Sequence, residues 1–432
     1  MMKLIRSLEK QYSDLSVGGI KEIRRKMILL ITLFWLYGRM VLFSPLLLII
    51  RIIKPIVLIR IGRLHSRRIG HFAANTELVI LESRRGINNP SKKYFDLFFL
   101  EKGNSSNSFL TKKWKEKLII LPTLILDPIY QLILIFPGAK DHQILPSNHD
   151  RDIHNLIEDS PPSITFNQQE IELGEAGIKD LGVLPHKPFV CLIVRDNAYL
   201  NMHLKPKDKE TYSYHNYRDC DIKSYLLTAE ELTQKGYYVV RMGVIVKEAL
   251  VSNNPMIIDY ANSGKRTEFM DVYLGAKCDF CISSGLGWDA IPTHLFRKPC
   301  LFAPILPIGY FPTYASQTLL ITKFHYSRQL KRNLTISEIA DLGLDLALSS
   351  NNFIDQNVDL IEPSPEDIWE AAQEMIEIVE GGGNYSEDDE NLQKKFWKLY
   401  PNKTINATPL HGQLRAKIGK SFLQNNKDWL LK

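Results

Sequence analysis

The sequence contains few cysteines, no regular repeat and one long stretch without any acidic residue. Only five of its 432 residues are cysteine, which is too few, and an odd number, for a disulfide-stabilised domain. Cys278 and Cys281 form a CxxC pair, but no second pair or histidine cluster accompanies it, so the pattern does not favour a zinc site. The cysteines lie in apolar segments, as buried thiols usually do, and we expect a reducing compartment.

The acid-free stretch, residues 27–68, divides the charge of the chain into two parts. Residues 1–26 carry seven Lys and Arg against three Asp and Glu, and residues 27–68 add seven cations. The first 68 residues therefore have a net charge of +11, and because the whole chain is +6, the other 364 residues carry −5. This asymmetry excludes a uniformly basic nucleic-acid-binding protein and predicts an anionic partner at one end only.

The predicted anionic partner is a membrane surface, because the most apolar segment, residues 27–50, lies between the basic clusters. Its 24 residues are long enough to span a bilayer, but Arg39 at its centre is costly in hydrocarbon. Gly38 and Pro45 also weaken a continuous helix. We therefore expect a short helical hairpin or oblique segment in one leaflet, with a single span and a soluble buried hairpin as alternatives. A cleaved signal peptide is not expected, since no small-residue cleavage site follows.

Residues 118–137 form a second apolar segment, which three prolines and Asp127 interrupt. These interruptions exclude a clean transmembrane helix. We expect one core helix or a pair of core helices here, and the alternative is a second face that dips into the membrane.

Strand-like and helix-like segments alternate along the rest of the chain, which predicts an α/β fold with parallel sheets. We divide it into a membrane-associating segment (1–54), an N-terminal Rossmann-like acceptor domain (55–185), a C-terminal Rossmann-like donor domain (186–380) and an acidic loop with a docked helix (381–432). The predicted strands are 56–61, 94–100, 189–194, 237–240, 256–259, 280–283 and 300–303, and the predicted helices begin near 72, 109, 221, 268, 289 and 364 and in the tail near 410.

Polar and glycine residues follow several strands of the second α/β unit, where open α/β sheets bind ligands. Arginines at three positions could neutralise a diphosphate, and the turn Ser283–Gly287 precedes a predicted helix whose N-terminus would favour an anion. Alternatively, each arginine pairs with a nearby acid such as Asp196 or Asp219. The candidate binding residues of this rim are Arg195, Asp196, Tyr199, Arg218, Arg241, Gly243, Asp259, Tyr260, Ser283, Ser284, Gly285, Gly287 and Asp289.

The loop 212–221 is rich in aromatic and polar side chains, which suits a sugar or nucleoside, and adds His215 and Tyr217 to the candidates. Asp219 and Asp221 match a DxD metal motif, but two acids at this spacing are common and Asp221 stands where a helix cap is expected. We therefore predict no metal site.

The first α/β unit offers a general base. His71 follows the first strand in an arginine-rich loop, and a histidine near its ordinary pKa could take a proton from an acceptor hydroxyl. Glu77 is a second catalytic candidate and Asn75 a substrate-binding one. The alternatives are a structural hydrogen bond for His71 and contact with lipid phosphates for Arg63, Arg67 and Arg68.

Seven short motifs occur together over roughly residues 55–430. They are Arg68-Ile-Gly-His71-x-Ala73-Ala-Asn75-Thr-Glu77, Val194-Arg-Asp196, His215-Asn-Tyr-Arg218, Gly236-Tyr-Tyr-Val-Val-Arg-Met-Gly243, Ile258-Asp-Tyr260, Phe269-Met-Asp271 and Ser283-Ser-Gly-Leu-Gly287. This combination resembles a family of bacterial glycosyltransferases of surface-polysaccharide synthesis. More loosely, the Ser-Ser-Gly turn resembles that of heptosyltransferases and fucosyltransferases, where this rim holds the donor nucleotide.

The resemblance implies a GT-B architecture, in which two Rossmann-like domains face a cleft, and a nucleotide-sugar donor such as a UDP- or GDP-sugar, with no obligatory cofactor or metal. The expected function is transfer of a sugar to a lipid-linked or polysaccharide acceptor at the cytoplasmic face of the bacterial inner membrane. Asp259 and Asp289 would contact ribose, base or sugar hydroxyls. A sugar-nucleotide epimerase or hydrolase, and a non-catalytic nucleotide-sugar-binding scaffold, are the alternatives.

Overall fold

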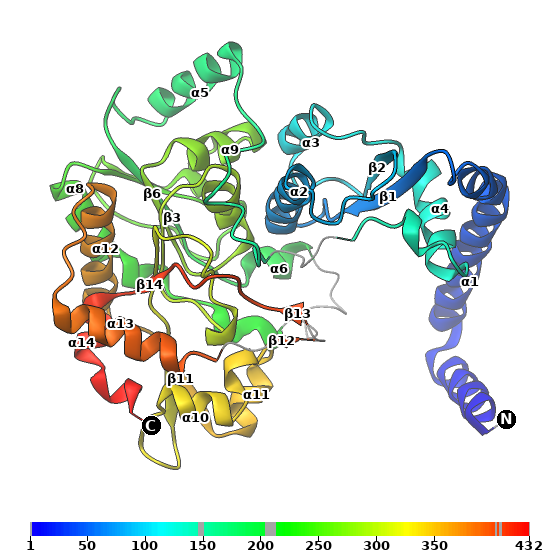
Figure 1. The fold of residues 1–432 in the computed structure, drawn as a ribbon. Coiled ribbons are helices and arrows are strands. Elements are labelled where there is room, and N and C mark those ends of the chain that lie inside the picture. Colours follow the sequence, from blue (N-terminus) through cyan, green and yellow to red (C-terminus); the bar gives the residue numbers. More distant parts are fainter. Residues whose placement is uncertain (1, 146–150, 204–212, 402–403, 406–407, 432) are drawn as a thin grey trace. The chain divides into compact units, whose positions relative to one another are not determined.

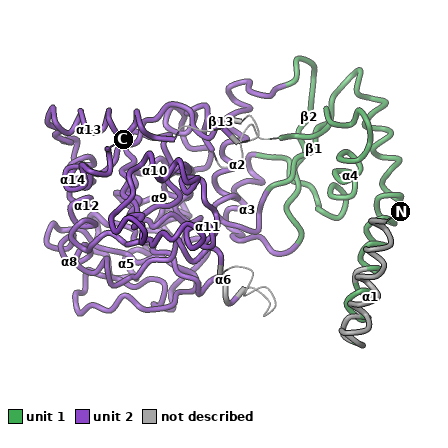
Figure 2. Tube along the Cα trace, turned by 90° about the horizontal axis from the view of Figure 1, so that it is seen from below, with its two compact units in different colours: residues 1–64, 90–102, 118–145 green, residues 65–89, 103–117, 146–432 purple. Residues whose placement is uncertain are grey.

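The computed structural model describes residues 2–145, 151–203, 213–401, 404–405 and 408–431. It divides into two compact units, which are built from interleaved parts of the chain (Figures 1 and 2). Unit 1 comprises residues 1–64, 90–102 and 118–145, and unit 2 comprises residues 65–89, 103–117 and 146–432. The predicted domain boundaries stay predictions.

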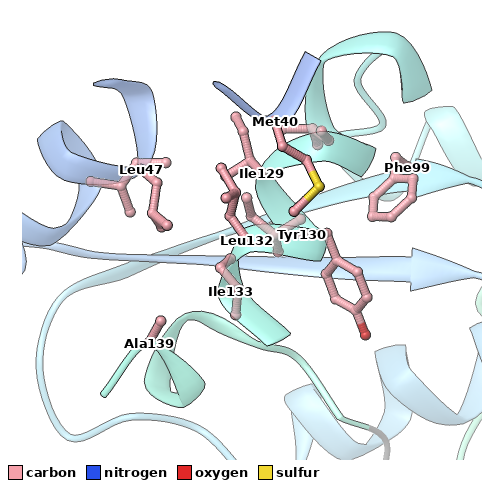
Figure 3. Packing of buried hydrophobic residues seen from close by; sticks show 11 residues of the cluster. Met40, Leu47, Phe99, Ile129, Tyr130, Leu132, Ile133 and Ala139 are labelled. Atoms are coloured by element: carbon pink, nitrogen blue, oxygen red, sulfur yellow. The ribbon is translucent and has the colours of Figure 1, made fainter. Parts of the chain in front are cut away.

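Unit 1 packs two helices against a small parallel sheet. Strands β1 (Leu58–Leu64) and β2 (Tyr94–Leu100) pair in parallel over their whole lengths. Helix α4 (Thr123–Ile135) lies beside the last part of α1 (Met2–Ile52), and a short turn, η1 (Lys140–His142), follows. The core of the unit is one apolar cluster, in which Met40 and Leu47 of α1 face Ile129 and Ile133 of α4 (Figure 3).

The predicted hairpin in the first apolar segment is wrong, because α1 is one continuous helix of 51 residues. Pro45 has no N–H to donate to the carbonyl of Val41, the loss that made a break plausible. The hydroxyl of Ser44 donates to that carbonyl instead, at 2.8 Å. The side chain next to the proline therefore replaces the missing backbone bond, and the helix continues.

Unit 2 is built on a seven-stranded, fully parallel sheet with the order β14-β8-β7-β6-β3-β4-β5. When β14 is left out and the other six strands are numbered by their sequence, their order across the sheet is 3-2-1-4-5-6. This is the order of the doubly wound dinucleotide-binding fold. Its strands are β3 (Phe189–Ile193), β4 (Tyr238–Arg241), β5 (Ile257–Ile258), β6 (Phe280–Ser283), β7 (Cys300–Phe302), β8 (Thr318–Leu320) and β14 (Lys417–Ile418).

Helices α8 and α12 lie beside this sheet, and further helices and small strands complete the unit (Figure 1). The helices are α2 (Ile69–Arg84), α3 (Ser108–Lys115), α5 (Gln168–Asp180), α6 (Ala198–His203), α8 (Leu226–Gln234), α9 (Glu268–Lys277), α10 (Ile336–Asp341), α11 (Ser350–Asp355), α12 (Pro365–Val379), α13 (Glu387–Leu399) and α14 (Lys420–Asn425). Short helical turns are η2 (Ser213–Arg218), η3 (Ile222–Tyr225), η4 (Tyr260–Asn262), η5 (Gly287–Asp289), η6 (Ile291–Leu295), η7 (Ile308–Tyr310), η8 (Leu344–Leu346) and η9 (Lys427–Leu430), and the small antiparallel strands are β9 (Phe324–Ser327), β10 (Arg332–Asn333), β11 (Val358–Ile361), β12 (Thr404–Ile405) and β13 (Thr408–Pro409).

The α/β fold class, its parallel sheets and the apolar N-terminal helix are confirmed. The predicted start of α12 is confirmed too, since Ser364 and Asp367 form a capping box around Pro365. The predicted acidic loop is wrong from Glu387 onward, because Ser386 caps helix α13 there. The predicted tail helix is preceded by a strand, β14, which extends the main sheet.

Candidate active site

The switch point of the large sheet lies between β3 and β6, the adjacent strands from which the sheet is wound in opposite directions. Ligands of open α/β sheets bind beyond the strand ends at this point. Arg195 follows β3 and Ser284 follows β6, and the backbone N–H of Arg195 donates to the hydroxyl of Ser284 at 2.7 Å. The structure thus brings these two predicted residues together at the place where a ligand is expected.

The turn Ser283–Gly287 is closed by its own hydrogen bonds. The carboxylate of Asp289 accepts from the Ser283 hydroxyl at 2.8 Å and from the Leu286 N–H at 2.9 Å. The Gly285 N–H donates to the Ser283 hydroxyl at 3.0 Å, and the Ser284 N–H donates to Ile193 of β3. These N–H and hydroxyl donors are therefore paired with acceptors in the turn or in β3. The bonds hold the turn in one conformation, and Asp289 has a structural role in it.

The helix predicted over 289–296 is present as an irregular helical stretch, in which the 3-10 turn η5 ends at Asp289 and the π-helical turn η6 covers Ile291–Leu295. Pro292 lies inside this stretch, and a proline cannot supply the N–H that a regular helix needs. The stretch therefore follows the turn as expected, but it does not offer the N-terminus of a regular α-helix.

A longer helix, α2, begins beside the turn instead. Its N-cap residue Arg68 makes no side-chain cap, and the first N–H groups of a helix have no acceptor inside it. A Cβ placed on Gly70 would lie 2.7 Å from the Cα of Gly287, and a Cβ on Gly287 would lie 3.1 Å from the nitrogen of Gly70. Both positions need glycine, and their contact sets the positive end of a 16-residue helix against the switch-point turn.

The charges of three arginines act on His215 at this edge. Burial and then the charges of Arg195, Arg218 and Arg68 lower the pKa of His215 to about 4. Burial and the neighbouring Arg218 also lower the pKa of Arg195. One acid, Asp219, lies 3.3 Å from Arg195, and among the described residues neither Arg68 nor Arg218 has an ion-pair partner. The edge therefore carries an excess of positive charge.

Arg218 also holds the turn Ser283–Gly287 in place, because its guanidinium donates to the carbonyl of Gly285. Asp219 is held in place by Arg195 and by Lys323, whose ammonium lies 2.6 Å from the Asp219 carbonyl. Asp221 caps η3 by accepting from the N–H of Lys223 at 2.9 Å, as expected for a residue before a helix. The two acids of the DxD motif are thus engaged separately.

His71 lies in the first turn of α2, next to Gly70, and is half-buried. Its ring lies 6.2 Å from that of His65. Asn75 follows one turn later on the same helix face, and in the described part of the chain neither polar atom of its buried side chain has a hydrogen-bond partner. A buried amide without partners is costly, which favours Asn75 as a ligand-binding side chain.

Glu77, the second catalytic candidate, is fully buried and lies 2.7 Å from the guanidinium of Arg297. It also accepts from the N–H of Ser163 at 3.1 Å. Burial raises the pKa of Glu77, and Arg297 opposes that rise. This geometry favours a structural role, in which Glu77 ties α2 to the body of unit 2.

Arg241 and Asp259 form a second buried pair. Arg241 is 1% exposed, and its guanidinium lies 3.2 Å from the carboxylate of Asp259 and 3.1 Å from the carbonyl of Glu248. Asp259 also accepts from the N–H of Leu250 at 3.0 Å. The alternative considered from the sequence, an arginine paired with an acid, describes Arg241, so we do not assign it a diphosphate contact.

The other predicted residues of the rim serve mainly to hold loops. Asp196 accepts from the N–H groups of Ala198 and Lys247, both at 2.8 Å. A Cβ on Gly243 would lie 2.6 Å from Val246. Tyr260 is buried against Asp271, and Tyr217 is buried beside Phe353. Tyr199 is 40% exposed and open to solvent.

Sequence reasoning missed Arg68 and Gly70 as parts of this site and Arg297 as an anchor. The usable signal for Arg68 was its position directly before a helix. Nothing in the sequence indicates that Gly70 would meet Gly287, because the two lie 217 positions apart.

Solved structures of other proteins are similar to this chain, and two of them are described here. No family model and no curated protein matches the chain. An E. coli ADP-heptose LPS heptosyltransferase II is 13% identical, with a TM-score of 0.35, over 61% of this chain and 90% of that one. A glycosyl transferase family 9 protein from Veillonella parvula is 11% identical, with a TM-score of 0.41, over 73% of this chain and 97% of that one.

Proposed function

We propose that this protein is a glycosyltransferase, which uses a nucleotide-sugar donor and a lipid-linked or polysaccharide acceptor. The observation that carries the proposal is the cluster of Arg68, Arg195 and Arg218 at the switch point of a dinucleotide-type sheet. A diphosphate carries the charge that such a cluster attracts. The motif resemblance to bacterial glycosyltransferases supports the same reaction class.

The donor would bind with its diphosphate between the first turn of α2 and the arginines. Negative charge builds up on the leaving diphosphate as the glycosidic bond breaks, and fixed positive groups stabilise it in the transition state. Arginine side chains and a helix N-terminus supply this charge without a metal ion, so we propose metal-independent transfer.

His71 is the proposed general base, which would take the proton of the acceptor hydroxyl. It lies one residue after Gly70, so the base and the diphosphate site belong to the same unit. Asn75 is proposed to orient the sugar or the acceptor through its amide.

Donor binding is tested by titrating UDP-, GDP-, CMP- and dTDP-linked sugars into the wild-type protein and Arg218→Gln. Glutamine removes the charge but keeps an N–H donor for the Gly285 carbonyl. A hydrogen bond to a charged group contributes about 1.5–3 kcal/mol, so we expect the dissociation constant to rise at least about tenfold. The matched control is Arg328→Gln, whose wild-type arginine is exposed and bound to Asp359 on a different sheet.

Transfer is tested separately, by incubating the protein with a radiolabelled donor and a bacterial lipid extract. His71→Ala should bind the donor like the wild type and lose transfer to the lipid fraction. Donor binding without turnover by the wild type would indicate a scaffold instead. Release of free sugar without transfer would indicate a hydrolase, and binding of no nucleotide sugar would refute the proposed site.

A further inference from the structure

Two helices of unit 1 expose apolar side chains to solvent. On α1, Phe34, Val41 and Leu42 are 81%, 73% and 70% exposed. On α4, Leu124 and Ile135 are 56% and 64% exposed, although the same helix packs its other face into the core. Many exposed apolar side chains on two neighbouring helices indicate an interaction site.

A hydrogen bond from Arg39 connects helices α1 and α4. Pro128 has no N–H to donate to the carbonyl of Leu124, four residues earlier in α4. The guanidinium of Arg39 donates to that carbonyl at 2.6 Å and lies 5.2 Å from the ring of Trp35. The one charge inside the apolar part of α1 is therefore bound to α4, which explains why an apolar helix tolerates it.

This hydrogen bond limits how α1 can be placed in a membrane. Residues 23–52 of α1 are long and apolar enough to cross a bilayer by composition, but from Leu36 onward the helix packs against the core that α4 and the sheet of unit 1 form. Asp127 of α4 lies 3.5 Å from Lys102, whose side chain is 61% exposed. A crossing centred on Arg39 would carry this ion pair into hydrocarbon, which is costly.

A crossing by the preceding part of α1 is too short. Between Lys26 and Leu36 there are only nine residues, which span about 14 Å as a helix. The hydrocarbon core is about 30 Å thick. Arg24, Arg25 and Lys26 lie just before them and would have to enter the core as well.

We propose that α1 and α4 lie together along the surface of an anionic lipid bilayer, with their exposed apolar side chains in one leaflet and no helix crossing it. Charge complementarity identifies the partner. Residues 23–76 contain no acid, and Arg24 and Arg51 flank the apolar faces, where they can contact lipid phosphates. The proposal does not depend on the glycosyltransferase assignment.

The proposal is tested with the full chain, vesicles of phosphatidylglycerol and phosphatidylcholine, and an environment-sensitive NBD label on single introduced cysteines. Val41→Cys reports on α1 and Leu134→Cys on α4, where the wild-type leucine is 49% exposed. Leu173→Cys, on α5 of unit 2, is the control, because that leucine is 60% exposed. Unmodified protein serves as the labelling blank, since four of its five thiols are buried.

We expect brominated lipids to quench the labels at 41 and 134 to a similar extent and the label at 173 hardly at all. Quenching at 41 alone would refute a role for α4. Quenching at neither position would mean that a partner other than lipid covers the apolar faces. Both results would overturn the proposal.

The in-plane orientation needs a second measurement. Ile20→Cys, at a position 86% exposed, should react fully with a membrane-impermeant maleimide added to protein-loaded vesicles. Reaction only after detergent would show that α1 crosses the bilayer, and would overturn the in-plane arrangement. Ile135→Lys should weaken vesicle binding by about tenfold, while Leu173→Lys should leave it unchanged.

Discussion

At the scale of single residues, the candidate site depends on a contact between two backbones. Gly70 of α2 and Gly287 of the switch-point turn approach too closely for a side chain on either one. This contact allows the positive end of α2 to face the same edge as Arg195 and Arg218.

Replacing Gly70 with alanine should therefore harm both stability and donor binding. The added Cβ would lie 2.7 Å from a backbone atom, and such an atom cannot move aside like the end of a flexible side chain. Overpacking of this kind costs about 1–3 kcal/mol. Denaturant unfolding measures that loss, and donor titration should show weaker binding.

Gly382→Ala is the matched control, because a Cβ there would meet its nearest atom at an ordinary 3.5 Å. Its stability and donor binding should equal those of the wild type. Equal behaviour of Gly70→Ala would show that α2 can shift without affecting the site.

At the scale of elements, a buried ion pair between Arg297 and Glu77 attaches helix α2 to the rest of unit 2. Arg297 donates to Glu77 of α2 and also to the carbonyls of Ile157, Ser160 and Pro161 in the loop before α5. One side chain thus ties α2 and a long loop to the helical turn after the site.

Glu77→Ala should lower the free energy of unfolding by about 3–5 kcal/mol, because it leaves the charge of Arg297 buried without its partner. Glu77→Ala combined with Arg297→Ala should lose less than the sum of the single changes. Urea unfolding of the four proteins measures this coupling. Additive losses, or normal stability with abolished transfer in Glu77→Ala, would instead return Glu77 to its predicted catalytic role.

Glu374 of α12 makes the docking of α14 depend on pH. Its carboxylate accepts from the Tyr385 hydroxyl at 2.5 Å and from the Lys420 N–H at 2.6 Å. Burial raises the pKa of Glu374 to about 7 despite these bonds. The folded state then holds a proton that the unfolded state releases near pH 4.5, so stability should fall as the pH rises from about 4.5 to 7.

Thermal unfolding between pH 5 and 8 tests this direction. Glu374→Gln should lose less stability than the wild type across that range, since it has no proton to release. Glu377→Gln, on the same helix but with a side chain that is 46% exposed, should follow the wild-type curve. A wild-type curve that rises with pH would contradict the direction.

These elements also show what sequence patterns can and cannot predict. Strands β3 to β7 of the large sheet and α9 were predictable, because short apolar runs and capping residues are local signals, whereas β8 and β14 were not predicted. The irregular geometry of the helix over 289–296 was not predictable in the same way, although Pro292 lies inside it and removes an N–H that a regular helix needs. The pairing of Arg241 with Asp259 was equally hidden, since which acid reaches an arginine depends on how the loops fold.

At the scale of the whole molecule, the chain passes between its two units repeatedly. Helices α2 and α3 lie in sequence among the strands of unit 1, yet belong to unit 2. The ring N–H of Trp114 on α3 donates to the carbonyl of Phe72 on α2 at 3.1 Å, and Asn107 donates to Glu268 at the start of α9. Helices α2 and α3 are therefore held by contacts within unit 2, far from their neighbours in sequence.

A fragment of residues 186–432 should therefore be much less stable than the full chain, although it holds the entire seven-stranded sheet. It lacks α2, α3 and α5, and so exposes the buried partners of Glu77 and the aromatic side chains Phe269, Tyr273 and Phe296, which pack on Phe109 and Phe166. We expect a lower unfolding midpoint, exposed hydrophobic surface by dye binding and no measurable affinity for the donor, since Arg68 and the start of α2 are missing.

A fragment that unfolds at the wild-type midpoint and binds the donor would show that the site is complete within residues 186–432. Helix α2 would then not be part of the site.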